Sequence, residues 1–354
     1  MDVDALEARA REVLDPMAYD YYASGADDEI TVHDNRAAWQ RVRLLPRVLR
    51  DVSQLSTETT VLGTPMAAPI LIAPMAAQRL AHADGEVGMA RAAAATGTVM
   101  VVSTMATATV EDVAAAAPDG TRWFQLYVQR DRDFTADLLK RVSASWYGAV
   151  VLTVDLPVLG RRRRDEINQF EFPEGITMAN LEIGLESAGG SALAEHANAA
   201  FAAGLVPDDI GWVAEVTGLP VLVKGVLRAD DAERCVAAGA AGVVVSNHGG
   251  RQLDGAIATA DALPAIVDAV AGRVPVLVDG GIRGGYDVLK AIGMGASAAL
   301  VGRPFLWGLA TGGSDGAAAV MKELIAEFER AMALCGCRSV DEIDGSLIAA
   351  RGDT

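Results

Sequence analysis

Residues 242–255 read GVVVSNHGGRQLDG, and this stretch carries the first signal for the fold and for the chemistry. The run 242–245 is apolar and β-branched, which is typical of a buried strand. The polar turn after it holds His248 and Arg251, and the two glycines between them allow the backbone to bend sharply. An imidazole can accept a proton, and a guanidinium can bind a carboxylate through two parallel hydrogen bonds. The stretch therefore predicts either a site for an acid substrate that loses a proton or a surface turn with an incidental histidine.

Short apolar runs of the same kind recur along the chain and alternate with helical, often Ala-rich segments such as 85–96, 229–238 and 261–270. Strict alternation of strand and helix predicts parallel strands, and uninterrupted apolar strands predict burial on both faces. Eight such units favour a TIM (β/α)8 barrel over an open doubly wound sheet. No G-x-G-x-x-G motif follows the first strand, which argues against a dinucleotide-binding Rossmann fold. The strands are expected at 70–73, 99–102, 123–127, 149–154, 221–223, 243–245, 276–278 and 298–301.

The barrel is expected to span residues 66–354, and residues 1–65 are expected to form a helical extension that packs on it within a single domain. Active-site groups of such barrels lie at the carboxyl ends of the strands. Only one of the four histidines, His248, falls at such an end, so the incidental turn is the weaker interpretation. The residues at these ends are Pro74, Met75, Ala76, Ser103, Gln125, Tyr127, Thr153, Asp155, Lys224, Ser246, His248, Arg251, Asp279, Gly280, Gly281, Arg283, Gly302 and Arg303.

The last two strand ends carry a second signal. Glycines and two arginines follow strands seven and eight, which is the usual phosphate-binding corner of a barrel. A phosphorylated ligand is therefore favoured. Lys224 then has two possible roles, as a Schiff-base nucleophile or as a fixed positive charge beside an electron-rich cofactor.

Composition limits the class of protein. The net charge of −17 argues against nucleic acid and anionic membranes as partners. No apolar run is long enough to span a bilayer, and the acidic start Met1–Asp4 is unlike a secretory leader, so a cytoplasmic protein is expected. Three cysteines make neither a disulfide framework nor a metal site, and no metal is expected.

The connection after the fourth strand, residues 156–208, is much longer than an ordinary loop. It begins with four consecutive arginines, 161–164, and at least one of them is expected to bind an anion at the mouth of the barrel. Residues 184–204 are rich in Ala, Gly, Ser and Glu and are expected to be mobile or to form a lid.

Several stretches in the same order resemble one family, the FMN-dependent α-hydroxy acid oxidases and dehydrogenases, and the overall pattern is similar to bacterial 4-hydroxymandelate oxidases. The resemblance rests on 246–254, 19–26, 124–128, 153–155 with 159–162, 222–225 and 278–283. It implies FMN as the cofactor and a 2-hydroxy acid as the substrate, which is oxidised to a 2-oxo acid. It also implies a homo-oligomer, commonly a tetramer.

The resemblance also implies a role for each strand-end residue. His248 would take the substrate hydroxyl proton, and Asp155 would hold and polarise its imidazole. Arg251 and Tyr21 would bind the substrate carboxylate, and Arg162 would add positive charge near it. Tyr127 would bind the hydroxyl side of the substrate. The residues that would contact the flavin ring or ribityl chain are Pro74, Met75, Ala76, Ser103, Gln125, Thr153, Lys224 and Ser246. Of these, Lys224 would stabilise negative charge on the reduced flavin. The ribityl chain and the phosphate group of FMN would be held by Asp279, Gly280, Gly281, Arg283, Gly302 and Arg303.

Two departures bear on the substrate and the electron acceptor. The family often carries Trp where this chain has Met105, so the pocket would accept an aromatic acid such as mandelate or 4-hydroxymandelate; ordinary packing of Met105 is the alternative. The apolar insertion of membrane-bound dehydrogenases and a haem domain are both lacking, and the small Ala76 is compatible with O2 reaching the flavin, so an oxidase that makes H2O2 is favoured. A lactate or glycolate oxidase, a dehydrogenase of the same family, a Schiff-base aldolase using Lys224 and a non-catalytic phosphate-binding barrel remain as alternatives.

Overall fold

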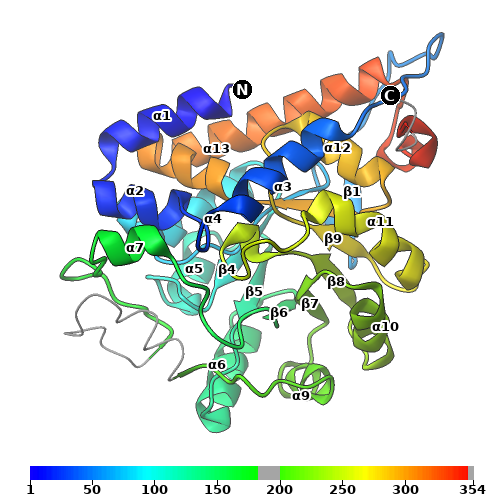
Figure 1. Ribbon diagram of the computed structural model, residues 1–354. Coiled ribbons are helices and arrows are strands. Elements are labelled where there is room, and N and C mark those ends of the chain that lie inside the picture. Colours follow the sequence, from blue (N-terminus) through cyan, green and yellow to red (C-terminus); the bar gives the residue numbers. More distant parts are fainter. Residues whose placement is uncertain (182–199, 350–354) are drawn as a thin grey trace.

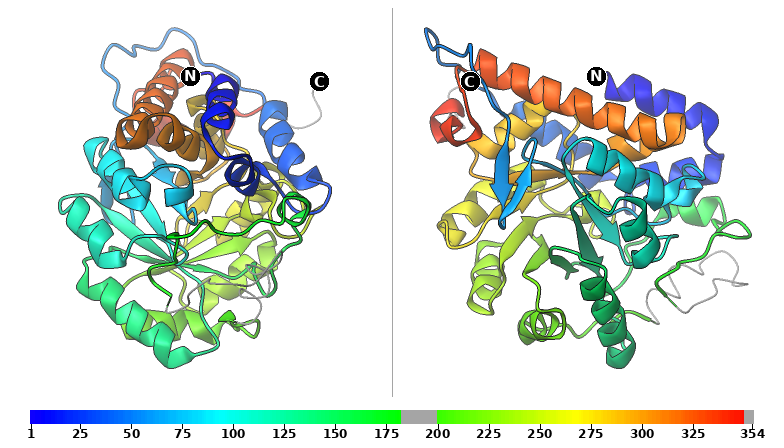
Figure 2. Two further views of the ribbon diagram at one scale, coloured as in Figure 1. Left: turned by 90° about the vertical axis from the view of Figure 1, so that its left-hand side faces the viewer. Right: turned by 180° about the vertical axis from the view of Figure 1, so that it is seen from behind.

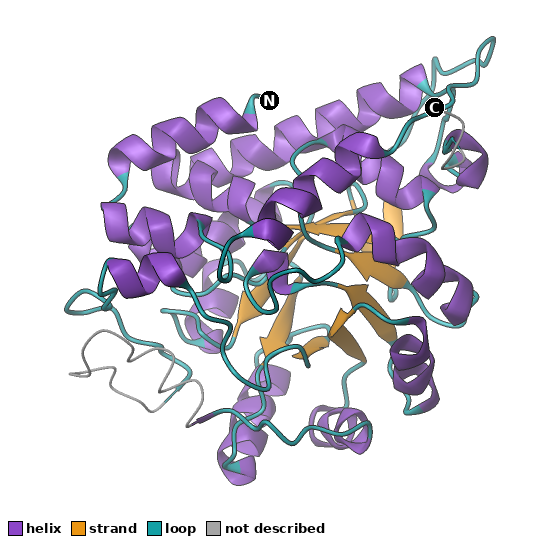
Figure 3. Ribbon diagram, viewed as in Figure 1, coloured by secondary structure: helices purple, strands orange, loops and turns teal. Residues whose placement is uncertain are grey.

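Eight parallel strands close into a barrel in the computed structural model, which describes residues 1–181 and 200–349. The strands are β3 (Ile70–Ile72), β4 (Val99–Ser103), β5 (Arg122–Leu126), β6 (Val150–Thr153), β7 (Val221–Val226), β8 (Gly242–Val245), β9 (Val276–Val278) and β10 (Ala298–Val301). Each strand pairs with its neighbours in sequence, and β10 pairs with β3 to complete the circle. Figure 3 shows the strands at the centre and helices around them. The predicted TIM barrel and its eight strands are confirmed.

A helix follows every strand of the barrel and covers its outer face (Figure 1). The many alanines of α4 favour a helix. Asp131 precedes α6 and caps it, because its carboxylate accepts a hydrogen bond from Phe134 N at 3.0 Å. These helices are α4 (Gly85–Ala95), α5 (Val110–Ala116), α6 (Arg132–Ala144), α9 (Asp208–Thr217), α10 (Ala229–Ala237), α11 (Thr259–Val270), α12 (Gly285–Gly293) and α13 (Arg303–Leu334). The short helix α7 (Arg163–Ile167) lies in the connection between β6 and α9. Most of the segment expected to be mobile or a lid, 184–204, lies outside the described residues.

Side chains alternate between the two faces of the barrel wall, as they must in a strand. In β4, Val99 and Val101 belong to the apolar cluster inside the barrel, whereas Met100 and Val102 belong to the cluster beneath the surrounding helices. The interior cluster consists of Val61, Met66, Leu71, Ala73, Val99, Val101, Trp123, Ala149, Val151, Leu222, Val244, Leu277, Ala298 and Leu300. This filled interior is a packed core and not a pore, so the space for a ligand lies above it, at one end of the barrel.

The N-terminal residues form three helices, α1 (Val3–Val13), α2 (Pro16–Ala23) and α3 (Ile30–Arg41). Figures 1 and 2 show α1 beside α13, and α3 reaches the turn after β8. A two-stranded hairpin, β1 (Thr59–Val61) and β2 (Thr64–Met66), follows them and adds Val61 and Met66 to the barrel interior. The hairpin was not predicted, and the expected boundary between 65 and 66 falls inside β2; the division of the chain at that point stays a prediction.

Short 3₁₀ turns complete the described structure: η1 (Gln78–Leu80), η2 (His248–Gly250), η3 (Val340–Glu342) and η4 (Gly345–Leu347). Within residues 1–181 and 200–349, no helix is both long and apolar enough to cross a membrane. The same residues contain no cluster of His, Cys, Asp or Glu that could hold a metal ion. Cys235, Cys335 and Cys337 are free thiols.

Candidate active site

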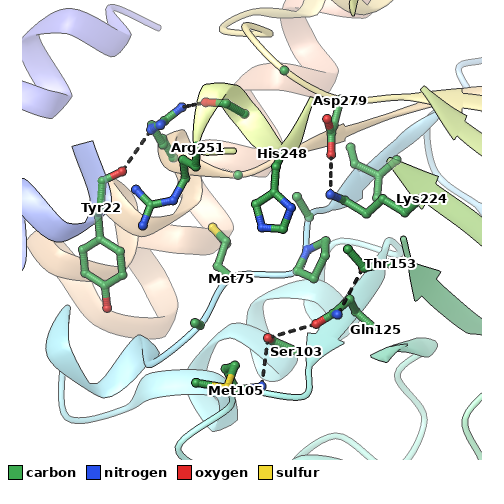
Figure 4. Close-up of a pocket in the computed structure, with 18 of the residues that line it drawn as sticks. Tyr22, Met75, Ser103, Met105, Gln125, Thr153, Lys224, His248, Arg251 and Asp279 are labelled. Carbon is green, nitrogen blue, oxygen red and sulfur yellow. Dashed lines mark hydrogen bonds and ion pairs between the residues drawn. The ribbon is translucent and has the colours of Figure 1, made fainter. Parts of the chain in front are cut away.

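A row of polar side chains covers the packed interior at the carboxyl ends of the strands. Because Val99 and Val101 face inward, the alternation along β4 turns Ser103 inward as well. The Ser103 hydroxyl donates to Gln125 Oε1 at 3.1 Å, and Gln125 Nε2 donates to Thr153 Oγ1 at 3.1 Å (Figure 4). Strand alternation therefore places donors and acceptors side by side on one surface inside the barrel.

Lys224 continues this row on β7. Its Nζ donates to Ser246 Oγ at 3.0 Å and lies 3.3 Å from Asp279 Oδ2. Burial opposes the charge on the amine, but the carboxylates of Asp279 and Asp155 outweigh it and raise the pKa of Lys224. Lys224 is therefore a fixed cation, and a lysine held in this form is a poor Schiff-base nucleophile.

A cavity of about 1150 Å³, counted with the space open to solvent at its mouth, lies directly above this row. Figure 4 shows residues from the carboxyl ends of several strands gathered around it, among them Ser103, Gln125, Lys224 and His248. Nearly all predicted site residues line it: Tyr21, Pro74, Met75, Ala76, Ser103, Met105, Gln125, Tyr127, Thr153, Arg162, Lys224, His248, Arg251, Asp279, Gly280, Gly281, Arg283, Gly302 and Arg303. Two predicted residues, Asp155 and Ser246, do not line it but bond to residues that do.

His248 stands between two polar partners. Its Nδ1 lies 2.9 Å from Asp155 Oδ1, and its Nε2 lies 3.2 Å from the Tyr127 hydroxyl. Burial lowers the pKa of His248, Lys224 and Arg162 lower it further, and Asp155 opposes them. Burial would raise the pKa of Asp155, but the charge and hydrogen bond of His248 outweigh burial and lower it. The pair therefore combines an ionised carboxylate with an imidazole that is neutral near pH 7 and presents Nε2 to the cavity.

The backbone of the turn η2 explains the two glycines of the motif. His248, Gly249 and Gly250 have φ angles of 58°, 64° and 78°, so three consecutive residues adopt the left-handed conformation. A Cβ on Gly250 would lie 2.7 Å from Val32 N, so only glycine fits against helix α3. The turn thereby directs the imidazole into the cavity.

Arg251 is held by the end of helix α2. Its Nη1 donates to Tyr21 O at 2.7 Å and to Ser24 O at 2.8 Å, and its guanidinium carbon lies 5.3 Å from the centroid of the Tyr21 ring. Burial, followed by the positive charge of Arg162, lowers the pKa of Arg251 to about 10. Two guanidiniums that are buried and close to one another attract a carboxylate strongly.

The four consecutive arginines point in different directions. Arg161 pairs with Glu166, Arg163 with Asp28 and Arg164 with Asp20 and Glu29. Arg162 alone of the four lines the cavity; it is 8% exposed, and its Nε has no hydrogen-bond partner. The expectation that at least one of these arginines meets an anion thus applies to Arg162.

The corner after β9 and β10 has the donors that a phosphate group needs. Arg303 lies at the start of α13, and the preceding residue, Gly302, provides no side-chain cap for the free amides there. Burial, followed by the charges of Arg283 and Arg251, lowers the pKa of Arg303 to about 9. Arg283 Nε and Asp279 Oδ1 are buried without partners. Together with the polar row beside Lys224, these unpartnered groups fit a phosphorylated, polar-edged ring system such as FMN.

Opposite the charged groups the cavity is apolar. Met105, Leu156, Leu159 and Phe201 line this part, and the ring of Phe201 stacks on Tyr127 with centroids 4.9 Å apart and an interplanar angle of 29°. Of these, sequence reasoning identified only Met105 and Tyr127. Leu156 and Leu159 could have been found from their closeness to Asp155, but Phe201 has no sequence signal because a bridge to Gln129 brings it to the site. The other lining residues that the sequence did not identify are Tyr22, Ala73, Gly249, Ile282, Leu300 and Leu306.

The N-terminal helix α3 braces the site from outside. Asn35 and Asn247 exchange two side-chain hydrogen bonds of 2.8 and 2.7 Å, and Trp39 Nε1 donates to Gly280 O at 2.8 Å. The sequence predicted no role for residues 35–39. Their role depends on contacts across more than 200 residues of sequence, which no local pattern reveals.

Comparison with known proteins agrees with this geometry. The family model described as FMN-dependent dehydrogenase matches residues 10–350. The L-lactate oxidase of Nostoc sp. is 50% identical over 97% of this chain and 96% of its own length, and the glycolate oxidase of Spinacia oleracea is 46% identical over 99% and 96%. A crystal structure of mandelate oxidase with (S)-4-hydroxymandelic acid superposes with a TM-score of 0.94 at 44% identity, covering 98% of each chain. The chain therefore belongs to the FMN-dependent dehydrogenase family, and FMN is its cofactor.

Proposed function

We propose that this enzyme oxidises an aromatic 2-hydroxy acid, such as mandelate or 4-hydroxymandelate, to the 2-oxo acid and passes the electrons to O2, which becomes H2O2. One observation carries the proposal: the cation Arg251 and the imidazole of His248 line the same cavity as an apolar group of side chains, which consists of Met105, Leu156, Leu159 and Phe201. A molecule with a carboxylate, a hydroxyl and an apolar ring has the chemistry to contact both groups. The names of its oxidase relatives support the reaction class.

The protein's own residues would bind the acid and remove its proton. Arg251 and Arg162 would bind the carboxylate, with Tyr21 beside them, and Tyr127 would donate to the hydroxyl side. His248 Nε2 would accept the hydroxyl proton, while Asp155 keeps the other ring nitrogen protonated and stabilises the imidazolium that forms. FMN, when bound, supplies the acceptor for the electron pair of the substrate C–H bond.

The remaining predicted residues would hold FMN. We assign the flavin ring to Pro74, Met75, Ala76, Ser103, Gln125, Thr153 and Lys224, with Ser246 fixing the Lys224 amine. The ribityl chain and phosphate would meet Asp279, Gly280, Gly281, Arg283, Gly302 and Arg303. Lys224, which Asp279 and Asp155 keep positively charged, would stabilise negative charge on the reduced cofactor.

The main alternatives differ in substrate or acceptor. The two relatives named above are lactate and glycolate oxidases, which favours a short-chain acid, whereas the solved structure named with them is a mandelate oxidase with an aromatic ligand. A dehydrogenase of the same family would use another acceptor. An aldolase is disfavoured because Lys224 carries a raised pKa. A homotetramer in the cytoplasm is an expectation from the family resemblance, and sedimentation analysis would test the assembly.

A panel of 2-hydroxy acids tests the proposal. We expect kcat/KM to be higher for mandelate and 4-hydroxymandelate than for lactate and glycolate, with about one H2O2 formed per turnover in air, as the balance of a two-electron oxidation requires. Preference for glycolate would support the short-chain alternative. Turnover with an artificial acceptor but little H2O2 would support a dehydrogenase, and absence of flavin absorption in the purified protein would refute the whole proposal.

The pH dependence of kcat/KM should reflect the protonation of His248, the proposed base. His248 must be neutral to accept a proton, and burial lowers its pKa from the ordinary value of 6.5. We therefore expect kcat/KM to be constant around pH 7 and to fall about tenfold per pH unit only below a midpoint that lies under 6.5. Steady-state rates between about pH 4.5 and about pH 8 would measure this midpoint. A midpoint above 6.5 would contradict the surroundings assigned to the imidazole.

The size of residue 105 should set the substrate preference. Met105 is buried and lines the apolar part of the cavity, so Met105→Trp would fill the space for an aromatic ring. We expect kcat/KM for mandelate to fall by about tenfold or more and that for glycolate to stay within about threefold, as steric exclusion predicts. Met105→Leu, which conserves volume, is the control and should change neither value much. Equal losses for both acids would show that residue 105 acts through general packing.

A further inference from the structure

Two loops that line the cavity meet on a buried carboxylate that has no part in the proposed chemistry. Glu86, in the first turn of α4, is 0% exposed. Its Oε1 accepts hydrogen bonds from Gln78 N at 2.9 Å and Thr107 N at 3.0 Å, and its Oε2 accepts from the Thr107 hydroxyl at 2.5 Å. Gln78 belongs to the loop after β3, residues 73–81, and Thr107 to the loop after β4, residues 104–109. One side chain therefore joins the two loops.

The buried position of Glu86 makes its carboxylate depend on the donors that the two loops provide. In the described part of the chain, no lysine, arginine or histidine forms an ion pair with it. Its charge is stabilised by the three donors from the two loops and by the N-terminal end of α4, where a negative charge is favourable. A buried carboxylate is costly without its donors, so both loops must keep their positions relative to α4.

The same two loops are also joined beside the cavity. Ala77 N donates to Met105 O at 2.9 Å, and the Tyr22 hydroxyl donates to Ala77 O at 2.6 Å. Ala77 has a φ of 53°, a left-handed conformation that a residue with a Cβ adopts only when its neighbours hold it there. The flanking Ala76 and the bonded Met105 both line the cavity. A shift of either loop would therefore move the wall that faces the substrate side chain.

We propose that Glu86 is a positioning residue for substrate specificity: it fixes Met105 at the distance from Ala76, on the flavin side, that suits the side chain of the 2-hydroxy acid. The proposal rests on the proposed function for the identity of the substrate. His248 and Arg251 follow β8, and the groups that hold their side chains, Asp155 and the carbonyl oxygens of Tyr21 and Ser24, make no hydrogen bond to Glu86. Loss of the link should therefore weaken binding of an acid with a large side chain more than it slows the chemical step.

Thr107 offers a mild variant and an internal control. Thr107→Val removes the hydroxyl that Glu86 binds and keeps the side-chain shape. Thr98→Val removes an equally buried threonine hydroxyl, which donates to Ile70 O at the opposite end of β4, away from the cavity. Glu86→Gln removes the charge with little change of shape, and Thr107→Ser restores the hydroxyl.

In the FMN-loaded enzyme, we expect Thr107→Val to raise the KM for mandelate about fivefold, the effect of one lost hydrogen bond, with kcat within about twofold and the KM for glycolate unchanged. Glu86→Gln should act in the same direction and more strongly, and Thr107→Ser should restore the parent values. Thr98→Val should lower thermal stability as much as Thr107→Val without changing either KM. Hydrogen exchange at the Gln78 amide should also accelerate in Thr107→Val and not in Thr98→Val, because Glu86 links the two loops.

Two outcomes would overturn the proposal. If the KM for mandelate is unchanged in Thr107→Val and Glu86→Gln, Glu86 has only a structural role. The same rise in KM in Thr98→Val would show that any loosening of β4 has this effect. If the parent enzyme oxidises a different 2-hydroxy acid, the proposed substrate is wrong, but the exchange at Gln78 still decides whether Glu86 couples the loops.

Discussion

Replacing His248 with alanine is expected to lower the rate of flavin reduction by 2-hydroxy acid at least about 10²-fold, the low end of the contribution of a general base. The imidazole has the position and the protonation state of a base, since Asp155 occupies Nδ1 at 2.9 Å and Nε2 faces the cavity beside the Tyr127 hydroxyl. Among the described residues, the other ionisable groups that line the cavity beside His248 are poor bases, because Arg251 and Lys224 are cations and burial raises the pKa of Tyr127. The carboxylate of Asp155 lies behind the imidazole and does not line the cavity. Anaerobic stopped-flow measurement of flavin bleaching isolates this step from the reaction with O2.

The matched control is His33→Ala, at an exposed position of α3. It should reduce flavin at the parent rate. The His248→Ala protein should keep its bound FMN, because the proposed contacts to the cofactor come from other strands. A reduction rate within about tenfold of the parent would contradict the assignment of His248 as the base.

Much of the site could be predicted because, in a parallel barrel, the position of a residue along its strand determines which face and which end of the barrel its side chain occupies. Once β4 is recognised as a strand with Val99 and Val101 inside, Ser103 must face the same space, and the same step applies to Gln125 on β5. The ends of all eight strands meet at one rim, so residues from 74 to 303 converge without any knowledge of the loops between them. The glycines before Arg251 carried equally local information, since their left-handed backbone favours glycine and a Cβ at Gly250 would clash with Val32.

The parts that were not predicted depend on contacts between distant segments. Phe201 reaches the cavity through its bridge to Gln129, and Asn35 reaches Asn247 across 212 positions, although neither has a local pattern. The sequence alone does not distinguish the four consecutive arginines from one another. In the structure, Arg161 pairs with an acidic residue outside the cavity, Glu166, whereas Arg162 lines the cavity. The strands of the hairpin β1–β2, Thr59–Val61 and Thr64–Met66, lack the uninterrupted apolar run that identified the equally short β3 and β9.

Replacing Arg251 with lysine is expected to lower kcat/KM at least about 10²-fold, mainly through a higher KM, although the positive charge is kept. The guanidinium donates both hydrogens of Nη1 to backbone carbonyls, those of Tyr21 and Ser24, so Nη2 and Nε remain to donate to a carboxylate. Lysine has a single donor group that cannot fill both places, so it must leave either the carbonyl oxygens or the substrate with weaker hydrogen bonds. Two charge-assisted hydrogen bonds of about 1.5–3 kcal/mol each account for a loss of this size.

The increase in KM should be matched by weaker binding of a product analogue. Benzoylformate carries the carboxylate and the ring but has no hydroxyl to oxidise, so its effect on flavin absorption reports binding without turnover. Its Kd should rise in Arg251→Lys and stay constant in Arg273→Lys, whose guanidinium also donates to two backbone carbonyls, those of Val270 and Ala269, but lies away from the cavity. If the Kd of benzoylformate stays within about fivefold of the parent, the lost hydrogen bonds are worth less than one ordinary bond. Arg162 would then be the main carboxylate ligand, because it is the other guanidinium beside Arg251 that has an unpartnered donor at the cavity.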